Sequence, residues 1–173
     1  MIIHLQTERF ILRDVIEEDV EGFYELDSDP EVHRYLGNSP VTDKAKLLDL
    51  IKYVQQQYID NGIGRWAIVD KITNEFIGWC GLKLVKDTIN NQSNYYDLGY
   101  RLIRKHWGKG IATETAKASI EYGFNVLQLK EIIGAIHCDN VASNNVVKKL
   151  GFELVETFEF EGEMHNWHKL VKK

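Results

Sequence analysis

The chain has 173 residues, of which 44% are hydrophobic and 27% charged, and its formal net charge is −5 at pH 7. This length and composition are typical of a folded domain and exclude a disordered or fibrous chain. The acidic balance argues against a general nucleic-acid-binding protein, which needs a basic surface to neutralise phosphates, and favours a cationic small-molecule or peptide substrate.

Membrane insertion and secretion are not expected from the sequence. Polar residues from His4 onward interrupt the short apolar stretch at the N-terminus, so no signal peptide is expected. No apolar run reaches the roughly 18–20 residues needed to span a bilayer. The two cysteines, Cys80 and Cys138, each lie in an apolar run and are expected to be reduced core thiols. We therefore expect a cytoplasmic protein.

In the first part of the chain, apolar periodicity predicts one strand followed by helices. A proline at a first helical position and an Asn-Gly pair at a helix end help to set the boundaries. The expected elements are a strand over 8–13, a helix over Asp19–Asp27, a short helical turn over Glu31–Leu36 and a helix capped by Thr42 and ending at Asn61-Gly62.

Alternating apolar positions then predict strands, interrupted by two further helices. The whole is a single mixed α/β domain over residues 1–173, in the order β-α-α-β-β-β-α-β-α-β-β. The expected elements are strands over Trp66–Lys71, Phe76–Val85 and Tyr95–Ile103, a helix over Thr113–Leu127, a strand over Glu131–Cys138, a helix over Ala142–Leu150, and strands over Phe152–Phe160 and Met164–Val171.

The most informative segment runs from Asp97 to Thr113, where a strand leads into a glycine loop directly before a helical pattern. A helix N-terminus leaves backbone N–H groups without partners, and its dipole favours negative charge. Gly108 and Gly110 lack the side chains that would keep a phosphate from these amides. The sequence therefore predicts that the loop binds a phosphorylated ligand.

Three stretches carry a family resemblance. Leu5–Arg13 is similar to a TERLxLR start, Asp97–Glu114 to a strand, pyrophosphate loop and helix start, and Asn140–Phe152 to an NxxSxxVxxKLGF segment. Together they resemble the GNAT superfamily of acyl-CoA-dependent N-acetyltransferases, and within it the RimJ/RimL-like branch of ribosomal-protein N-terminal acetyltransferases. The resemblance implies the GNAT fold: a mixed, mostly antiparallel central sheet with helices on both faces and a splayed strand pair that admits acyl-CoA.

The resemblance also implies acetyl-CoA as the cosubstrate and no metal. The pyrophosphate would lie on the amides of the glycine loop, and the pantetheine arm would pair with the preceding strand and contact asparagines after the next one. The residues expected to bind the cofactor are Tyr100, Arg101, Leu102, Gly108, Lys109, Gly110, Ile111, Ala112, Thr113, Asn140 and Asn145.

The implied reaction is direct attack of a neutral amine on the thioester, without a covalent enzyme intermediate. The tyrosine that many relatives use to protonate the departing thiolate would fall at Val147, which cannot do this, so Ser143 is the expected acid. The other interpretation of Ser143 is a local helix cap. Asp97 is expected to act as general base or substrate anchor, or to be a solvated carboxylate at a strand edge.

The acceptor is less well defined by the sequence. A protein N-terminus such as that of a ribosomal protein, a polyamine, an aminoglycoside and an amino acid are all open, and a homodimer is common among relatives. His165 and His168, three apart in an expected strand, should face opposite ways and form no metal site. Residues that could line the acceptor pocket are Glu31, His33, Tyr35, Trp79, Tyr95, Tyr96, His165 and Trp167.

Two alternatives remain beside the enzyme. A dinucleotide-binding oxidoreductase would explain the glycine loop, but Ala112 follows Gly110 by two residues, where the G-x-G-x-x-G fingerprint requires three. A non-catalytic acyl-CoA-binding module on the same fold would explain the missing tyrosine at Val147.

Overall fold

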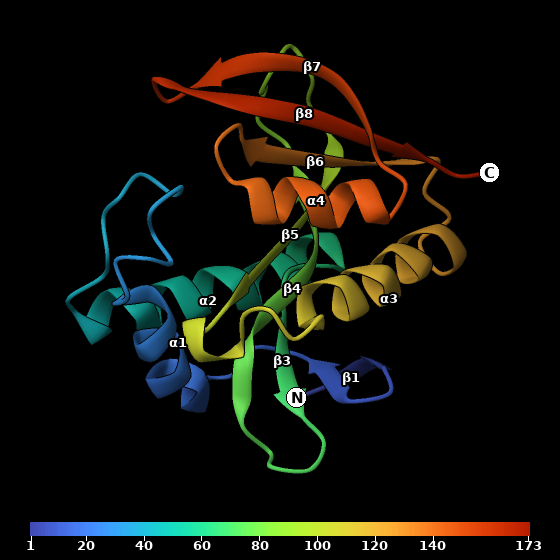
Figure 1. The fold of residues 1–173 in the computed structure, drawn as a ribbon. Coiled ribbons are helices and arrows are strands. Elements are labelled where there is room, and N and C mark those ends of the chain that lie inside the picture. Colours follow the sequence, from blue (N-terminus) through green and yellow to red (C-terminus); the bar gives the residue numbers. More distant parts are fainter.

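The computed structural model describes residues 1–173 and builds them around one eight-stranded sheet (Figure 1). The helices are α1 (Val20–Asp27), α2 (Lys44–Asn61), α3 (Ile111–Asn125) and α4 (Val141–Lys149), with short 3-10 turns η1 (Glu17–Asp19) and η2 (Arg104–His106). The strands are β1 (Ile3–Gln6), β2 (Phe10–Arg13), β3 (Trp66–Asp70), β4 (Phe76–Val85), β5 (Tyr95–Leu102), β6 (Glu131–His137), β7 (Glu153–Phe160) and β8 (Glu163–Val171).

The sheet has the strand order β1-β2-β3-β4-β5-β6-β8-β7. All neighbours are antiparallel except β5 and β6, which are parallel. This confirms the mixed, mostly antiparallel sheet expected from the sequence. It excludes the doubly wound parallel sheet that a dinucleotide-binding oxidoreductase requires.

Helices cover both faces of the sheet, and each face has its own apolar core. In Figure 1, α3 and α4 lie in front of the strands and α2 lies behind them. Burial of these apolar stripes stabilises the layers, because apolar surface leaves water. On the α3 and α4 face the buried helix residues include Ile111, Ala116, Ile120 and Val147. On the α1 and α2 face they are Phe23, Leu47, Ile51 and Val54.

Some local predictions were wrong. The chain has an additional strand, β1, which lies at the sheet edge with its residues exposed or half-buried, so it shows no apolar alternation. Asp43, and not Thr42, caps α2, because its carboxylate accepts the amide of Ala45 at 2.9 Å. The short turn expected over Glu31–Leu36 is present as turns. Helix α3 begins two residues earlier than expected, at Ile111.

Candidate active site

The glycine loop between β5 and α3 presents unpaired backbone amides. Gly108 and Gly110 have φ values of 71° and 73°, a left-handed conformation that a side chain would strain. The first hydrogen bond into α3 runs from the amide of Glu114 to the carbonyl of Gly110, so the amides of residues 111–113 have no acceptor in the chain. A Cβ at Gly108 would meet nothing within 4 Å. This open loop suits an anionic group such as a phosphate.

Two side chains hold this loop in place. The indole Nε1 of Trp107 donates to the carbonyl of Leu102 at 2.9 Å and so ties the loop to the end of β5. From the turn before β2, Arg9 donates through Nε to Glu114 Oε2 at 2.7 Å and through Nη2 to the carbonyl of Lys109 at 3.0 Å. The loop conformation is therefore fixed by contacts from both the sheet and α3.

A cavity of about 200 Å³ lies where β5 and β6 diverge, and we call it the β5–β6 cavity. The two strands share a single residue pair, Asp97 with Ile133, and beyond it β5 has a full neighbour only on the β4 side. Backbone groups of β5 that face the gap can therefore be satisfied by a ligand. The divergence confirms the splayed strand pair expected from the resemblance.

The structure brings five of the thirteen predicted site residues to this cavity. Leu102 is buried, and Asn145 is exposed on α4; neither lines the cavity. Residues 108–113 form the glycine loop and the first turn of α3, and they do not line the cavity either. The predicted site residues that do line it are Asp97, Tyr100, Arg101, Asn140 and Ser143. Of the expected acceptor residues, Tyr35, Trp79 and His165 line it.

The start of α4 places Ser143 at the cavity. Asn140 caps the helix, its side chain accepting the amide of Ser143 at 3.2 Å. The hydroxyl of Tyr100 donates to the carbonyl of Ser143 at 3.0 Å, and burial raises the pKa of Tyr100, so its phenol stays protonated. The Ser143 side chain also interacts with the Tyr100 hydroxyl, which lowers the pKa of Tyr100 by less than burial raises it. A hydroxyl can rotate, so it can donate to a ligand in the cavity instead. Val147 is packed in the core at 1% exposure.

Both carboxylate oxygens of Asp97 contact hydrogen-bond donors of the protein. Its Oδ2 lies 2.6 Å from Arg65 Nη2, and its Oδ1 accepts a long contact of 3.4 Å from the amide of Ala135 in β6. Arg65 Nη1 also donates to the carbonyl oxygens of Gly81, at 2.5 Å, and of Asp97 itself. Asp97 is therefore not a solvated carboxylate at a strand edge. Its Oδ1 retains the capacity to accept a hydrogen bond from a ligand.

Two histidines on the β6 and β8 side differ in which nitrogen is available. His165 Nδ1 donates to the carbonyl of Glu163 at 3.0 Å, so the neutral ring keeps its lone pair on Nε2. In His137 the roles are reversed, because Nδ1 accepts the amide of Asp139 at 3.1 Å and Nε2 lies 3.2 Å from the Glu163 carboxylate. Both rings line the cavity, and His165 is the one that can accept a proton.

Two arginine side chains, one from β5 and one from the residue before β3, pack against the indole of Trp79 on β4. The guanidinium of Arg101 lies 5.1 Å from the centroid of the Trp79 ring, and that of Arg65 lies 5.5 Å from it. Arg101 Nη1 also donates to Asp27 Oδ1 at 2.5 Å, and His33 Nε2 lies 3.1 Å from the same oxygen. His33 is thus behind the cavity wall and does not line it.

The other expected acceptor residues lie elsewhere. Tyr95 and Trp167 are buried together in a small core with Ile133, and Glu31 is exposed. Tyr96 packs against the main core. His168 is buried and bonded through Nε2 to Asn144 Oδ1, so it faces away from His165 as the alternation predicts.

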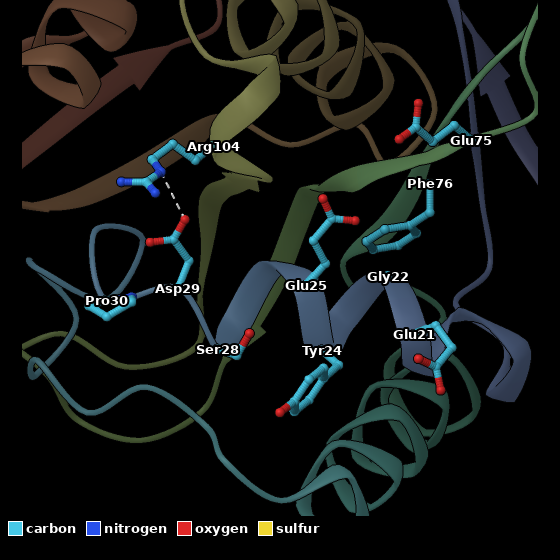
Figure 2. Close-up of a pocket in the computed structure, with 10 residues that line it drawn as sticks. All are labelled: Glu21, Gly22, Tyr24, Glu25, Ser28, Asp29, Pro30, Glu75, Phe76 and Arg104. Carbon is cyan, nitrogen blue, oxygen red and sulfur yellow. Dashed lines mark ion pairs between the residues drawn. The ribbon is translucent and has the colours of Figure 1, made fainter.

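A second, larger hollow of about 770 Å³ lies between α1 and the start of β4 (Figure 2). Four carboxylates line it, but each is already paired with a cation. The pairs are Asp29 with Arg104 (the dashed line in Figure 2), Glu21 with Lys44, and Glu25 and Glu75 both with Lys105. This wide hollow has neither the free amides of the glycine loop nor the strand divergence, so the β5–β6 cavity is the candidate active site.

Comparison with known proteins agrees with this geometry. Residues 9–153 match the model of the acetyltransferase (GNAT) domain, and the chain therefore belongs to the GNAT acetyltransferase family. It is an N-acyltransferase, and this assignment removes the non-catalytic alternative. The chain is 34% identical over 149 residues to the Bacillus licheniformis N-acetyltransferase p20, covering 86% of this chain and 82% of that protein.

Two further similar proteins have names that specify an acceptor. The Escherichia coli spermidine N(1)-acetyltransferase is 28% identical over 160 residues, covering 90% of this chain and 81% of that protein. The solved structure of RimL, a ribosomal L7/L12 alpha-N-protein acetyltransferase in complex with coenzyme A, is similar in fold. Its TM-score is 0.82 at 19% identity, and the alignment covers 98% of each chain. No helix of the chain is both long and apolar enough to cross a bilayer.

Sequence reasoning missed Arg65, His137 and the side-chain role of Arg101. The only local signal was for His137, which ends a strand three residues before Asn140. Arg65 and Arg101 reach the site from segments far apart in sequence, and only the sheet register brings them to one indole.

Proposed function

We propose that the chain transfers the acetyl group of acetyl-CoA to a primary amine, of a protein N-terminus or a small molecule, by direct attack on the thioester. The observation that carries the proposal is the divergence of β5 from β6, with a cavity at the gap and a free-amide glycine loop after β5. The amides after Gly108 would hold the pyrophosphate, and the open edge of β5 and Asn140 would hold the pantetheine arm.

Proton transfer precedes the attack, because an amine arrives as an ammonium ion at neutral pH. Asp97 Oδ1 anchors the amine, and Nε2 of His165, further along the same cavity, accepts its proton through intervening water. The nitrogen lone pair then forms a bond to the carbonyl carbon. A backbone N–H of β5 that faces the gap stabilises the oxygen as it gains charge.

Collapse of this adduct breaks the carbon–sulfur bond, and the electron pair leaves on sulfur. The Ser143 hydroxyl, which lines the cavity, gives a proton to the thiolate and is reprotonated by the proton that the acylated nitrogen releases. Holding the two reactants in line contributes up to about 7–11 kcal/mol to lowering the barrier. The products are the N-acetylated amine and free coenzyme A.

The TERLxLR-like start and the fold shared with RimL support a place in the RimJ/RimL-like branch. The same comparison supports a ribosomal-protein N-terminus as one acceptor to test. The relative that acts on spermidine supports a small-molecule amine as another.

The experiment is coupled thiol release from acetyl-CoA with a panel of amines. Ser143→Ala should lower kcat about 10–100-fold and His165→Gln by at least as much, while acetyl-CoA still binds. Lys149→Ala, an exposed position on the same helix, is the matched control and should change nothing. Full activity in both Ser143→Ala and His165→Gln would refute the assigned roles, and absence of acetyl-CoA binding would refute the function.

A further inference from the structure

The two arginines on Trp79 differ in how many of their donors the protein itself uses. Arg65 is engaged on both terminal nitrogens, Nη1 by two backbone carbonyls and Nη2 by Asp97. Arg101 uses only Nη1, toward Asp27, and no acceptor in the chain contacts its Nη2 or Nε. A guanidinium carries five N–H donors in a rigid fork, so most of those on Arg101 are left for a ligand in the β5–β6 cavity.

We propose that Arg101 binds a carboxylate of the acceptor, so that the preferred acceptors are amines that also carry a carboxylate group. This inference rests on the proposed acetyl transfer and names the acceptor class for the same site. A planar guanidinium pairs with a carboxylate through two parallel hydrogen bonds, which gives both affinity and orientation.

Trp79 and Asp27 fix the position of the Arg101 guanidinium. The Trp79 ring supports one face of the guanidinium at 5.1 Å, and Asp27, at 1% exposure, holds its Nη1. His33 contacts the same Asp27 oxygen from behind. Because Asp27 is held at the end of α1, it fixes where the arginine fork lies without occupying the two remaining nitrogens.

The charges of the cavity favour a carboxylate over a second ammonium. Asp97 is the one carboxylate that lines the cavity, and Arg65 already pairs with it at 2.6 Å. A second ammonium would find no free carboxylate, because Asp97 is paired with Arg65 and the buried Asp27 with Arg101. A carboxylate would instead meet the unused N–H donors of Arg101. The local charge of the site thus differs from the acidic balance of the whole chain, which favoured a cationic substrate.

The positions of the two anchors suggest a length for the acceptor. Asp97 and Arg101 lie four residues apart on β5 and therefore face the same side of the sheet, with Cα atoms roughly 13 Å apart. The long arginine side chain shortens this span. An amine at Asp97 and a carboxylate at Arg101 would therefore be separated by several bonds.

The test compares acids with their uncharged counterparts. The acceptors are L-α-amino acids and straight-chain ω-amino acids up to 6-aminohexanoate, each with its primary carboxamide, and spermidine as the polyamine. The carboxamide keeps the shape and removes the charge. The readout is kcat/KM from thiol release, and acetyl-CoA binding is followed separately by thermal stabilisation.

With the wild type, we expect one or more acids to exceed their carboxamides by at least about tenfold in kcat/KM. Arg101→Gln should abolish this preference, because kcat/KM should fall by more for the acid than for the carboxamide. Arg104→Gln, which removes an exposed arginine paired with Asp29 outside the cavity, should retain the preference. Because Arg101→Gln leaves Asp27 without its cation, the double variant Asp27→Asn/Arg101→Gln removes both charges and serves if the single variant does not fold.

Several results would overturn the proposal while the enzyme still binds acetyl-CoA. These are equal use of acids and carboxamides, a preference for spermidine, no acetylation of any acid, or an equal loss for acid and carboxamide in Arg101→Gln. Failure of acetyl-CoA to stabilise the protein would instead refute the acetyltransferase function itself, so the two failures are distinguishable.

Discussion

Gly99, in the middle of β5, lies directly beneath the Arg65 guanidinium, and Gly99→Ala should disrupt the wall of the cavity. A Cβ at this position would lie 2.6 Å from Arg65 Nη2 and 2.8 Å from its Cζ. Since unstrained contacts of this kind need roughly 3.5 Å, the guanidinium must move by about 1 Å. That movement breaks or lengthens its hydrogen bonds to Asp97 and to the carbonyl of Gly81.

The magnitude follows from those hydrogen bonds. A hydrogen bond to a charged group contributes about 1.5–3 kcal/mol, and Arg65 can recover part of this by reaching water. Replacing a strand glycine by alanine also returns a little stability. We therefore expect Gly99→Ala to lower the free energy of unfolding by about 2–3 kcal/mol, which corresponds to roughly 4–12 °C in Tm for a chain of this size.

Urea denaturation of Gly99→Ala beside Gly134→Ala tests this reasoning. Gly134 lies on the neighbouring β6, and its Cβ would meet Val147 and Phe152 at ordinary distances of 3.7–3.9 Å, so that variant should be unchanged or slightly more stable. In an Arg65→Ala background the cost of Gly99→Ala should vanish. Equal stability of the two glycine variants, or an equal cost in that background, would refute the proposed collision.

Further outcomes are expected at the loop, at β5 and at β8. Gly110→Ala places a side chain at φ 73° and should weaken acetyl-CoA binding about 5–30-fold by calorimetric titration, because the left-handed conformation costs about 1–2 kcal/mol. Tyr100→Phe removes the donor to the Ser143 carbonyl and should lower the free energy of unfolding by about 0.5–1.5 kcal/mol in urea. Burial and then the charge of Lys148 lower the pKa of His168, so below about pH 6.5 the unfolded chain binds more protons and stability falls as pH falls from about 7 toward 5. His168→Gln should flatten that dependence.

A different result would contradict each of these predictions. Unchanged acetyl-CoA affinity in Gly110→Ala would mean that the loop amides do not hold the cofactor. A Tyr100→Phe protein as stable as the wild type would mean that the hydroxyl bond to α4 contributes nothing. A pH profile that keeps its slope in His168→Gln would assign the titration to another group.

The parts of the fold that could be predicted are those with a strong local signal. Alternating apolar residues predicted β4 over Phe76–Val85 with its exact bounds, since both ends are marked by polar turns. The glycine loop was predictable because Gly108 and Gly110 precede a helical pattern, and both adopt the left-handed conformation that favours glycine. The strand β1 was missed because an edge strand with exposed side chains carries no apolar pattern.

The side of the cavity that carries Trp79 and its two arginines was not predictable, because it depends on contacts between distant segments. Arg65 precedes β3, Trp79 lies on β4 and Asp27 on α1, and none of these three belongs to a motif that the sequence shows. Arg101 lies in the Asp97–Glu114 stretch, but that stretch did not indicate the role of its side chain. Register between β4 and β5 pairs Trp79 with Arg101, and helix α1 supplies the buried carboxylate. Sequence reasoning reaches such a group only once the strand order is known.

Thermal stabilisation by acetyl-CoA, coenzyme A and NAD, measured side by side, tests the central claim most directly. A ligand at about 100 times its Kd adds about 2.7 kcal/mol to the free energy of unfolding, which is readily measured for a chain of this size. We expect both acetyl-CoA and coenzyme A to raise Tm and NAD to leave it unchanged. No shift with either coenzyme A species would contradict the assignment of the glycine loop and the β5–β6 cavity as the acetyl-CoA site.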